Sequence, residues 1–261
     1  GKCGQAIDEL VVSGAEVIFL NSYGYTSEAK ETISKYSDIH FYANESGVHD
    51  TNLSSYFVRM YQARYLSGII AGMRTESNQI GYVAAMSNYE VNRGINAFTL
   101  GVKSVNPDAE VIVIWTESWD NEAAEREAVG KLAEEGIDVI TYHQNQGYVA
   151  KEADKRGIDS IGYHQAVEGL SEHFLTAVVC DWEAVYRELI KEYVRGNGNS
   201  HESYWLGMEK NAVGLSEYSE LVSEDIIKKV EEAKSEIVSG FEVFSGVIYD
   251  NEGNLRCGQN E

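Results

Sequence analysis

The chain has 261 residues, of which 43% are hydrophobic, so it can bury a core in one large domain or in two modest α/β lobes. It carries 42 acidic against 21 basic side chains, a formal net charge of -21, and such a surface repels nucleic-acid phosphates and anionic lipid headgroups. No apolar run approaches the roughly 20 residues that a membrane span needs, and three cysteines without a Cys-x-x-Cys motif predict neither a disulfide framework nor a zinc site.

Two stretches of the chain repeat one pattern. Each contains a helix ended by a glycine, a short apolar strand, a polar loop that closes in Gly-Tyr, a short helix and a second strand. The markers are Gly14, 17–20, 24–25 and 39–42 in the first stretch, and Gly136, 139–141, 147–148 and 160–163 in the second. The glycines suit the left-handed position after a helix. The pattern predicts two related α/β units, with chance similarity between α/β segments as the alternative.

The remaining elements predict an open, mainly parallel sheet with helices on both faces. A helix rich in small residues ends the segment 51–73. Strands and helices then alternate up to the second repeat, at 79–84, 92–105, 110–115 and 121–135, with Ser118 or Asp120 as the expected cap of the last helix. Later elements are expected at 175–180, 182–195, 204–207, 212–215, 224–239 and, as a hairpin, 244–256.

These elements lead to a two-lobed arrangement. We expect residues 1–75 and 181–261 to form a discontinuous first lobe, and residues 76–180 to form the second. The first stretch lacks the strand–helix–strand that precedes the second, so we expect the first lobe to be truncated at its N-terminus or built differently.

Ligands bind beyond the carboxyl ends of the strands in open parallel sheets, and two such lobes that face each other form a cleft. Aromatic, amide, imidazole and carboxylate groups in the strand-end loops suit a flat heterocycle, because rings stack and edges hydrogen-bond. The predicted ligand-binding residues are Tyr23, Tyr25, Asn44, Glu90, Trp119, His143, Asn145 and Tyr163. The alternatives are a packing role for Trp119, a satisfied loop histidine at His143, and a helix-start carboxylate at Glu90.

Motifs of catalysis or metal binding are absent from the sequence. There is no GxGxxG after a strand, no GxxxxGK[ST], no HExxH and no GxSxG, and the six histidines lack metal-ligand spacing. We therefore predict a binding protein rather than an enzyme, with no catalytic residues, no metal and no cofactor.

Long runs of the sequence resemble the basic membrane protein (BMP) family of solute-binding lipoproteins, which serve ABC importers and whose characterised members bind nucleosides or purine bases. The similar runs are residues 59–85 (RMYQARYLSGIIAGMRTESNQIGYVAA), 90–115, 118–140, 178–190 and 205–215. The resemblance implies a type I periplasmic-binding-protein fold, with two lobes, three crossovers and a hinge. It also implies an N-terminal strand and helix with ligand residues, which this sequence lacks.

Departures from the family pattern bear on the ligand. Trp119 stands where the family usually has phenylalanine, and the neighbouring acid is shifted. Nucleoside binders place an aspartate near Gly162 to hold the ribose, whereas here Tyr163, His164, Gln165 and Ala166 follow. Compared with the family, the residues from His143 to Gln146 resemble the branch that takes a free purine base.

Three functional hypotheses follow. The first is an extracytoplasmic, lipid-anchored and monomeric receptor that captures a purine base or nucleoside by hinge closure and delivers it to the membrane permease of an ABC importer. The second is the ligand-sensing extracellular domain of a signalling protein. The third, and least favoured, is a nucleoside-processing enzyme.

Overall fold

The chain divides into two units, and it passes from one to the other after Arg59, Cys180 and Ala212. The first unit comprises Gly1–Arg59 and Asp181–Ala212, and the second comprises Met60–Cys180 and Val213–Glu261. The computed structural model describes residues 2–44, 47–48, 50–164, 172–196, 203–250 and 252–258.

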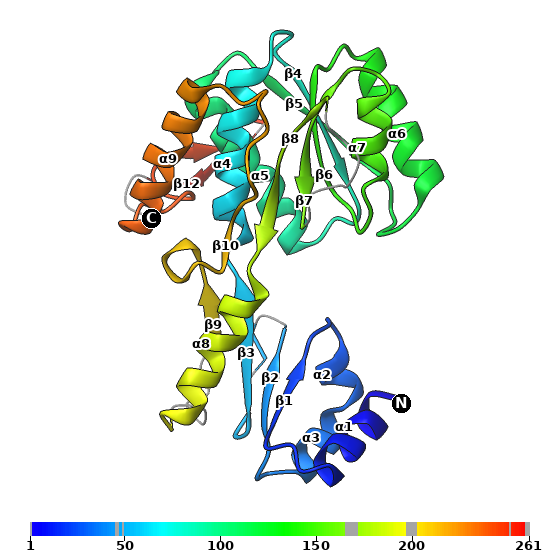
Figure 1. Ribbon diagram of the computed structural model, residues 1–261, viewed down its shortest axis with the longest axis vertical. Coiled ribbons are helices and arrows are strands. Elements are labelled where there is room, and N and C mark those ends of the chain that lie inside the picture. The colour runs from blue at the N-terminus through cyan, green and yellow to red at the C-terminus, as the bar shows by residue number, and fades with distance from the viewer. Residues whose placement is uncertain are drawn as a thin grey trace. The chain divides into compact units, whose positions relative to one another are not determined.

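The first unit is built on a parallel sheet with strand order β1-β2-β3-β9 (Figure 1). Its elements are α1 (Lys2–Val12), β1 (Val17–Leu20), α2 (Tyr25–Glu28), α3 (Lys30–Lys35), β2 (His40–Ala43), β3 (Leu53–Val58), α8 (Trp182–Val194), β9 (Ser203–Leu206) and the 3₁₀ turn Met208–Lys210.

The two faces of this sheet bury different side chains, because successive residues of a strand point to opposite sides. Ile7 of α1 and Ile33 of α3 belong to a mainly aliphatic cluster with Ile18, Leu20, Phe41 and Leu53. The other face is aromatic: Phe19 stacks on Tyr42 at 5.2 Å between ring centroids, and Tyr186 of α8 lies 4.9 Å from Phe19. Helices α1 and α3 thus cover one face and α8 the other.

The second unit is built on a sheet with strand order β10-β8-β7-β6-β4-β5, parallel except for the edge strand β10. Its elements are α4 (Met60–Arg74), β4 (Gln79–Ala84), α5 (Tyr89–Val105), β5 (Glu110–Trp115), α6 (Glu122–Glu134), β6 (Val139–His143), α7 (Tyr148–Asp154), β7 (Asp159–Tyr163), β8 (Phe174–Cys180), β10 (Val213–Leu215), α9 (Glu224–Val238), β11 (Ile248–Tyr249) and β12 (Leu255–Cys257). Helices α4 and α5 lie on one face of this sheet and α6 and α7 on the other (Figure 1).

Glycines allow α4 and α5 to pack backbone against backbone, as the small residues at the end of the segment 51–73 predicted. A Cβ on Gly68 would lie 2.0 Å from the carbonyl oxygen of Phe98, and a Cβ on Gly101 would lie 2.0 Å from that of Tyr65. Only residues without a side chain fit at these two positions.

The expected lobe boundary at residue 75 differs from the observed division. Helix α4 and the segment 213–261 belong to the second unit rather than to the first lobe. The physical reason is the packing of α4, which lies against α5 and α9 and against strands β8 and β10. The inward residues of α9 are Ile226, Val230, Ala233 and Ile237, and they are buried within this unit.

Local corrections concern the strand β3 and one helix cap. Strand β3 lies inside the segment 51–73, for which the sequence predicts only a helix. Helix α6 begins after Asn121, whose side chain accepts a hydrogen bond from the Ala124 N–H, so neither Ser118 nor Asp120 is the cap. Among the described helices, none is long and apolar enough to cross a membrane.

Candidate functional site

Three of the predicted ligand-binding side chains gather at the carboxyl ends of the strands in the second unit. His143 ends β6, Tyr163 ends β7, and their ring centroids are 4.1 Å apart. Trp119 lies in the loop after β5, with its ring centroid 5.8 Å from that of His143. Parallel strands bring these loops to one edge of the sheet. We call Trp119, His143 and Tyr163 the aromatic wall.

Hydrogen bonds join the loops after β5 and β6 and so fix the position of Trp119. The Asn145 N–H donates to the carbonyl of Trp119 at 2.9 Å, and the Gln144 side-chain amide donates to Thr116 Oγ1 at 2.7 Å. Thr116 in turn donates to the carbonyl of Ser118 at 2.9 Å. Trp119 remains 36% exposed, so its ring is anchored by its backbone yet open to a ligand.

Arg64, which the sequence pattern did not predict as a site residue, is fully buried beneath the aromatic wall. Its guanidinium donates to Thr141 Oγ1 at 3.1 Å and to the carbonyl of Tyr142 at 2.8 Å. It also lies 4.6 Å from the centroid of the Tyr163 ring and 5.3 Å from that of Tyr82. An arginine in the middle of a helix rich in apolar and small residues was the available signal, because a charged side chain is buried only where other groups bind it.

Glu90 lies in the first turn of α5, as its alternative interpretation proposed. The Asn88 side chain caps this helix by accepting hydrogen bonds from the N–H groups of Glu90 and Val91 at 3.0 and 2.9 Å. Burial raises the pKa of Glu90 above its usual range, while Arg93 and Arg64 oppose the rise. The carboxylate is therefore both a helix-start residue and an electrostatic neighbour of the buried arginine.

Burial keeps the other titratable groups of the wall uncharged at neutral pH. It lowers the pKa of His143 well below its usual value, with Arg64 and His164 adding to the effect, and it lowers the pKa of His164 to about 4. It raises the pKa of Cys180, at the end of β8, to about 12. A ligand here meets neutral imidazoles and a neutral thiol.

Several buried polar atoms of this edge have no hydrogen-bond partner within the part of the chain that the structure describes. They are Arg64 Nε, Tyr82 Oη, His143 Nδ1 and Gln144 Oε1. Buried polar groups in folded proteins are nearly always hydrogen-bonded. The aromatic wall therefore borders groups with hydrogen-bonding capacity left for a bound molecule.

The other predicted residues divide between the two units. Asn145 is exposed, and its backbone rather than its side chain makes the recorded hydrogen bond. In the first unit, Tyr23 and Tyr25 follow β1 and are 83% and 39% exposed. Asn44 follows β2, donates its N–H to the carbonyl of Leu20 at 2.8 Å, and has a buried side-chain oxygen without a partner among the described residues.

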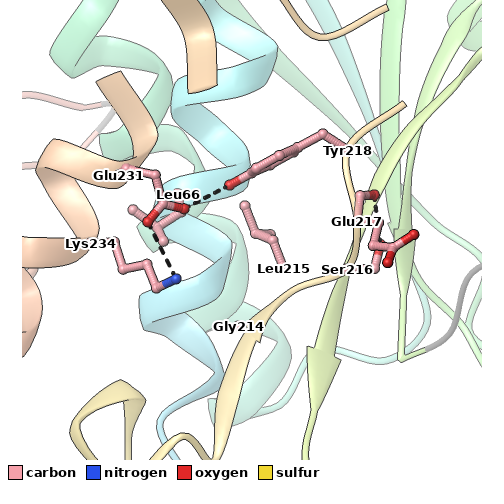
Figure 2. A pocket seen from close by; sticks show the side chains of 8 residues that line it. All are labelled: Leu66, Gly214, Leu215, Ser216, Glu217, Tyr218, Glu231 and Lys234. Atoms are coloured by element: carbon pink, nitrogen blue, oxygen red, sulfur yellow. Dashed lines mark hydrogen bonds and ion pairs between the residues drawn. The ribbon is translucent and has the colours of Figure 1, made fainter. Parts of the chain in front are cut away.

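A pocket of about 220 Å³ lies elsewhere in the second unit, between α4, α9 and the segment that follows β10. Figure 2 shows Tyr218 and Lys234 both directed at Glu231, with contacts of 3.4 Å each. Because these polar groups already satisfy one another, this pocket is a weaker candidate than the aromatic wall. Among the described residues, no group of three or more His, Cys, Asp or Glu side chains could hold a metal ion.

The doubly wound sheets, the three passages of the chain between its described units and the polar strand ends define the class: a two-lobed protein with the type I periplasmic-binding-protein fold. An ABC transporter solute-binding protein from Conexibacter woesei matches with a TM-score of 0.74 and 18% identity, over 91% of this chain and 82% of that one. Residues 3–245 match the Bmp family, described as ABC transporter substrate-binding protein PnrA-like. The chain belongs to this family, as its sequence predicted.

Two curated relatives are similar over nearly the whole chain. A purine-binding protein of Brucella abortus (strain 2308) is 31% identical over 259 residues, which cover 98% of this chain and 73% of the relative. A Haloferax volcanii protein, provisionally named an ABC transporter glucose-binding protein, is 30% identical over 252 residues, which cover 96% of this chain and 64% of the relative. The chain thus spans about two thirds to three quarters of their lengths.

Proposed function

We propose that this protein is the extracytoplasmic, lipid-anchored receptor of an ABC importer and that it captures a free purine base. The observation that carries the proposal is the aromatic wall with two buried hydrogen-bonding atoms beside it, His143 Nδ1 and Gln144 Oε1, which have no partner among the described residues. Membership of the substrate-binding family and the 31% identity to a purine-binding protein support it.

The wall suits a flat, uncharged heterocycle for reasons of chemistry. Trp119 offers a partly exposed ring for stacking, which contributes about 1 kcal/mol beyond the area buried. Neutral His143 can donate or accept one hydrogen bond, and the Gln144 oxygen accepts one. A purine base presents both N–H donors and ring-nitrogen acceptors along its edges, so it can satisfy both kinds of group.

We propose a free base rather than a nucleoside because of the residues at the end of β7; the carboxylate of Glu90 belongs to the first turn of α5 instead. A ribose diol is commonly held by a carboxylate, which accepts two hydrogen bonds. The residues at the end of β7 are Tyr163 and His164, neither of which is a carboxylate, and residues 165–171 lie outside the described part of the chain. The proposal includes capture by hinge closure, a monomeric state and a membrane permease as partner.

Ligand-dependent stabilisation tests this proposal directly. We would measure the thermal midpoint of the protein with adenine, guanine, hypoxanthine, their nucleosides and glucose, because a ligand that binds only the native state raises the midpoint. We expect an increase with at least one base and a smaller one with its nucleoside. An increase with glucose and none with any purine would contradict the assignment.

Replacing Trp119 tests the stacking role. We expect Trp119→Ala to weaken binding of the best base by about tenfold, as expected from the loss of one stacking ring, and Trp119→Phe to restore much of it. The control is Tyr249→Ala, which removes an aromatic ring that is 61% exposed on the hairpin strand β11. Isothermal titration calorimetry measures the affinity of the three variants for the base. Equal affinity of Trp119→Ala and the original protein would exclude the wall as the binding surface.

A further inference from the structure

Arg64 is fully buried in the second unit and forms no ion pair with any residue that the structure describes. Its recorded partners are a hydroxyl, Thr141 Oγ1, and a backbone carbonyl, that of Tyr142. Within the described residues no carboxylate lies within salt-bridge distance of its guanidinium. Burial of an unpaired charge is unfavourable, so a protein that keeps such a residue needs compensation from its surroundings.

Helix α5 approaches the unpartnered side of this guanidinium. A Cβ built on Gly94 would lie 3.8 Å from Arg64 Nε and 3.6 Å from Tyr82 Oη, so the helix backbone itself faces these two atoms. Glu90 precedes Gly94 by four residues and therefore lies on the same face of α5, one turn nearer the carboxyl edge of the sheet. The nearest carboxylate on this face of α5 thus stands beside the strand-end loops that carry the aromatic wall.

We propose that Arg64 is a positioning residue that holds Glu90 as an ionised hydrogen-bond acceptor at the border of the aromatic wall, where it receives an N–H group of the ligand. The ligand part of this inference rests on the proposed function, but the coupling between Arg64 and Glu90 does not. In this proposal the buried arginine contributes to ligand binding as well as to packing, and the site favours ligands with N–H groups along one edge.

The groups that face Glu90 come from its own helix α5 and from four other elements. Arg93 lies on the same helix, and Arg64 comes from α4. Tyr82 of β4, Tyr163 of β7 and Cys180 of β8 also face the carboxylate, and burial raises the pKa of each of these three groups, which keeps them uncharged. The two arginines are therefore the charges that favour the ionised form of Glu90 against its burial.

Titration of the ligand-free protein tests the coupling. The carboxyl ¹³C resonance of Glu90 would be followed against pH in the original protein and in Arg64→Met and Arg64→Lys. We expect Arg64→Met to raise the pH of the midpoint, because it removes a favourable charge, and Arg64→Lys to keep it near the original value. The control is Arg74→Met, which removes an arginine from the other end of α4, paired there with Asp159 at 2.6 Å. An unchanged midpoint in Arg64→Met would overturn the proposal.

A second measurement serves if Arg64→Met does not fold. The side-chain ¹Hε–¹⁵Nε resonance of Arg64 in the original protein should shift with pH at the midpoint of Glu90, and Glu90→Gln should abolish that shift. Glu90 is only partly buried at a helix start, so this variant is expected to fold. An Arg64 resonance that titrates identically in Glu90→Gln would show that the two groups are not coupled.

Binding of hypoxanthine, whose own charge does not change in the acidic range, separates the two proposals. We expect its affinity to fall as pH drops through the Glu90 midpoint, to fall at higher pH in Arg64→Met, and to lose this dependence in Glu90→Gln. A titration coupled as described, together with no binding of any purine, would reject the proposed function and leave the coupling intact. Binding with the same pH profile in all three proteins would reject the role of Arg64 in binding.

Discussion

The residues of the aromatic wall could be predicted from the sequence, whereas the arginine beneath them could not. Trp119, His143 and Tyr163 were predictable because each stands at or just after a parallel strand, and such strands end at one edge of a sheet. Arg64 was not predictable, because it lies within a helix and its partners Thr141 and Tyr142 lie far along the chain. No local pattern reports a side-chain contact of that range.

The buried histidine His40 makes the stability of the first unit depend on pH. Its two ring nitrogens have no hydrogen-bond partner among the described residues, and burial lowers the pKa of His40 to about 4. In the unfolded chain a histidine titrates near pH 6.5. As the pH falls from about 6.5 to about 4, the unfolded state binds a proton that the native state does not bind. The free energy of unfolding therefore decreases.

Substitution of His40 isolates this contribution. We expect His40→Phe, which keeps an aromatic ring beside Tyr42, to reduce the loss of stability between about pH 6.5 and about pH 4. Below about pH 4 the two proteins should lose stability in parallel. Urea unfolding at a series of pH values measures the difference, and identical pH dependence of both proteins would show that His40 is not responsible.

At the scale of elements, alternation and small-residue spacing predicted most helices and strands of the second unit. Strand β3 was missed because its sequence, LSSYFV, lacks the apolar alternation of a half-buried strand. Both of its serines are buried, and a neighbouring strand provides a partner for one of them, because the hydroxyls of Ser55 and Ser203 lie 2.6 Å apart. A strand buried on both faces shows no period, so tertiary pairing rather than pattern defines it.

Alanine in place of glycine should change the free energy of unfolding in opposite directions at two positions, because only one of them lies in the contact between α4 and α5. Gly101→Ala should lower the free energy of unfolding by about 3 kcal/mol, since its Cβ would lie 2.0 Å from a backbone oxygen and the helices would have to separate. Gly130→Ala on α6 is the control, because its nearest neighbour is the flexible end of Arg156 at 3.6 Å. That substitution should add about 0.5 kcal/mol or more through helix propensity. Chemical denaturation compares the two, and equal effects would refute the close packing.

At the scale of the whole molecule, the internal repeat predicted two related α/β units, and the family resemblance predicted the fold. Neither the repeat nor the resemblance predicted the boundaries between the units. The order of elements along the chain does not say which sheet a helix covers, and both α4 and α9 belong to the second unit rather than to the first lobe. The unit to which a helix belongs depends on the side chains that the helix buries, such as Val230 of α9, which is fully buried.

Val230→Ala therefore tests the division of the molecule. It removes two buried methyl groups from the contact of α9 with the second unit, and we expect a loss of about 2 kcal/mol in the free energy of unfolding. Hydrogen exchange should become faster in α4, α5 and the sheet of the second unit, while β1, β2 and β3 keep their protection, because the first unit buries its own core. Lys229→Ala, an exposed position on the same helix, should leave exchange unchanged. Faster exchange in β1 to β3 of Val230→Ala would instead assign α9 to the stability of the first unit, as the sequence had suggested.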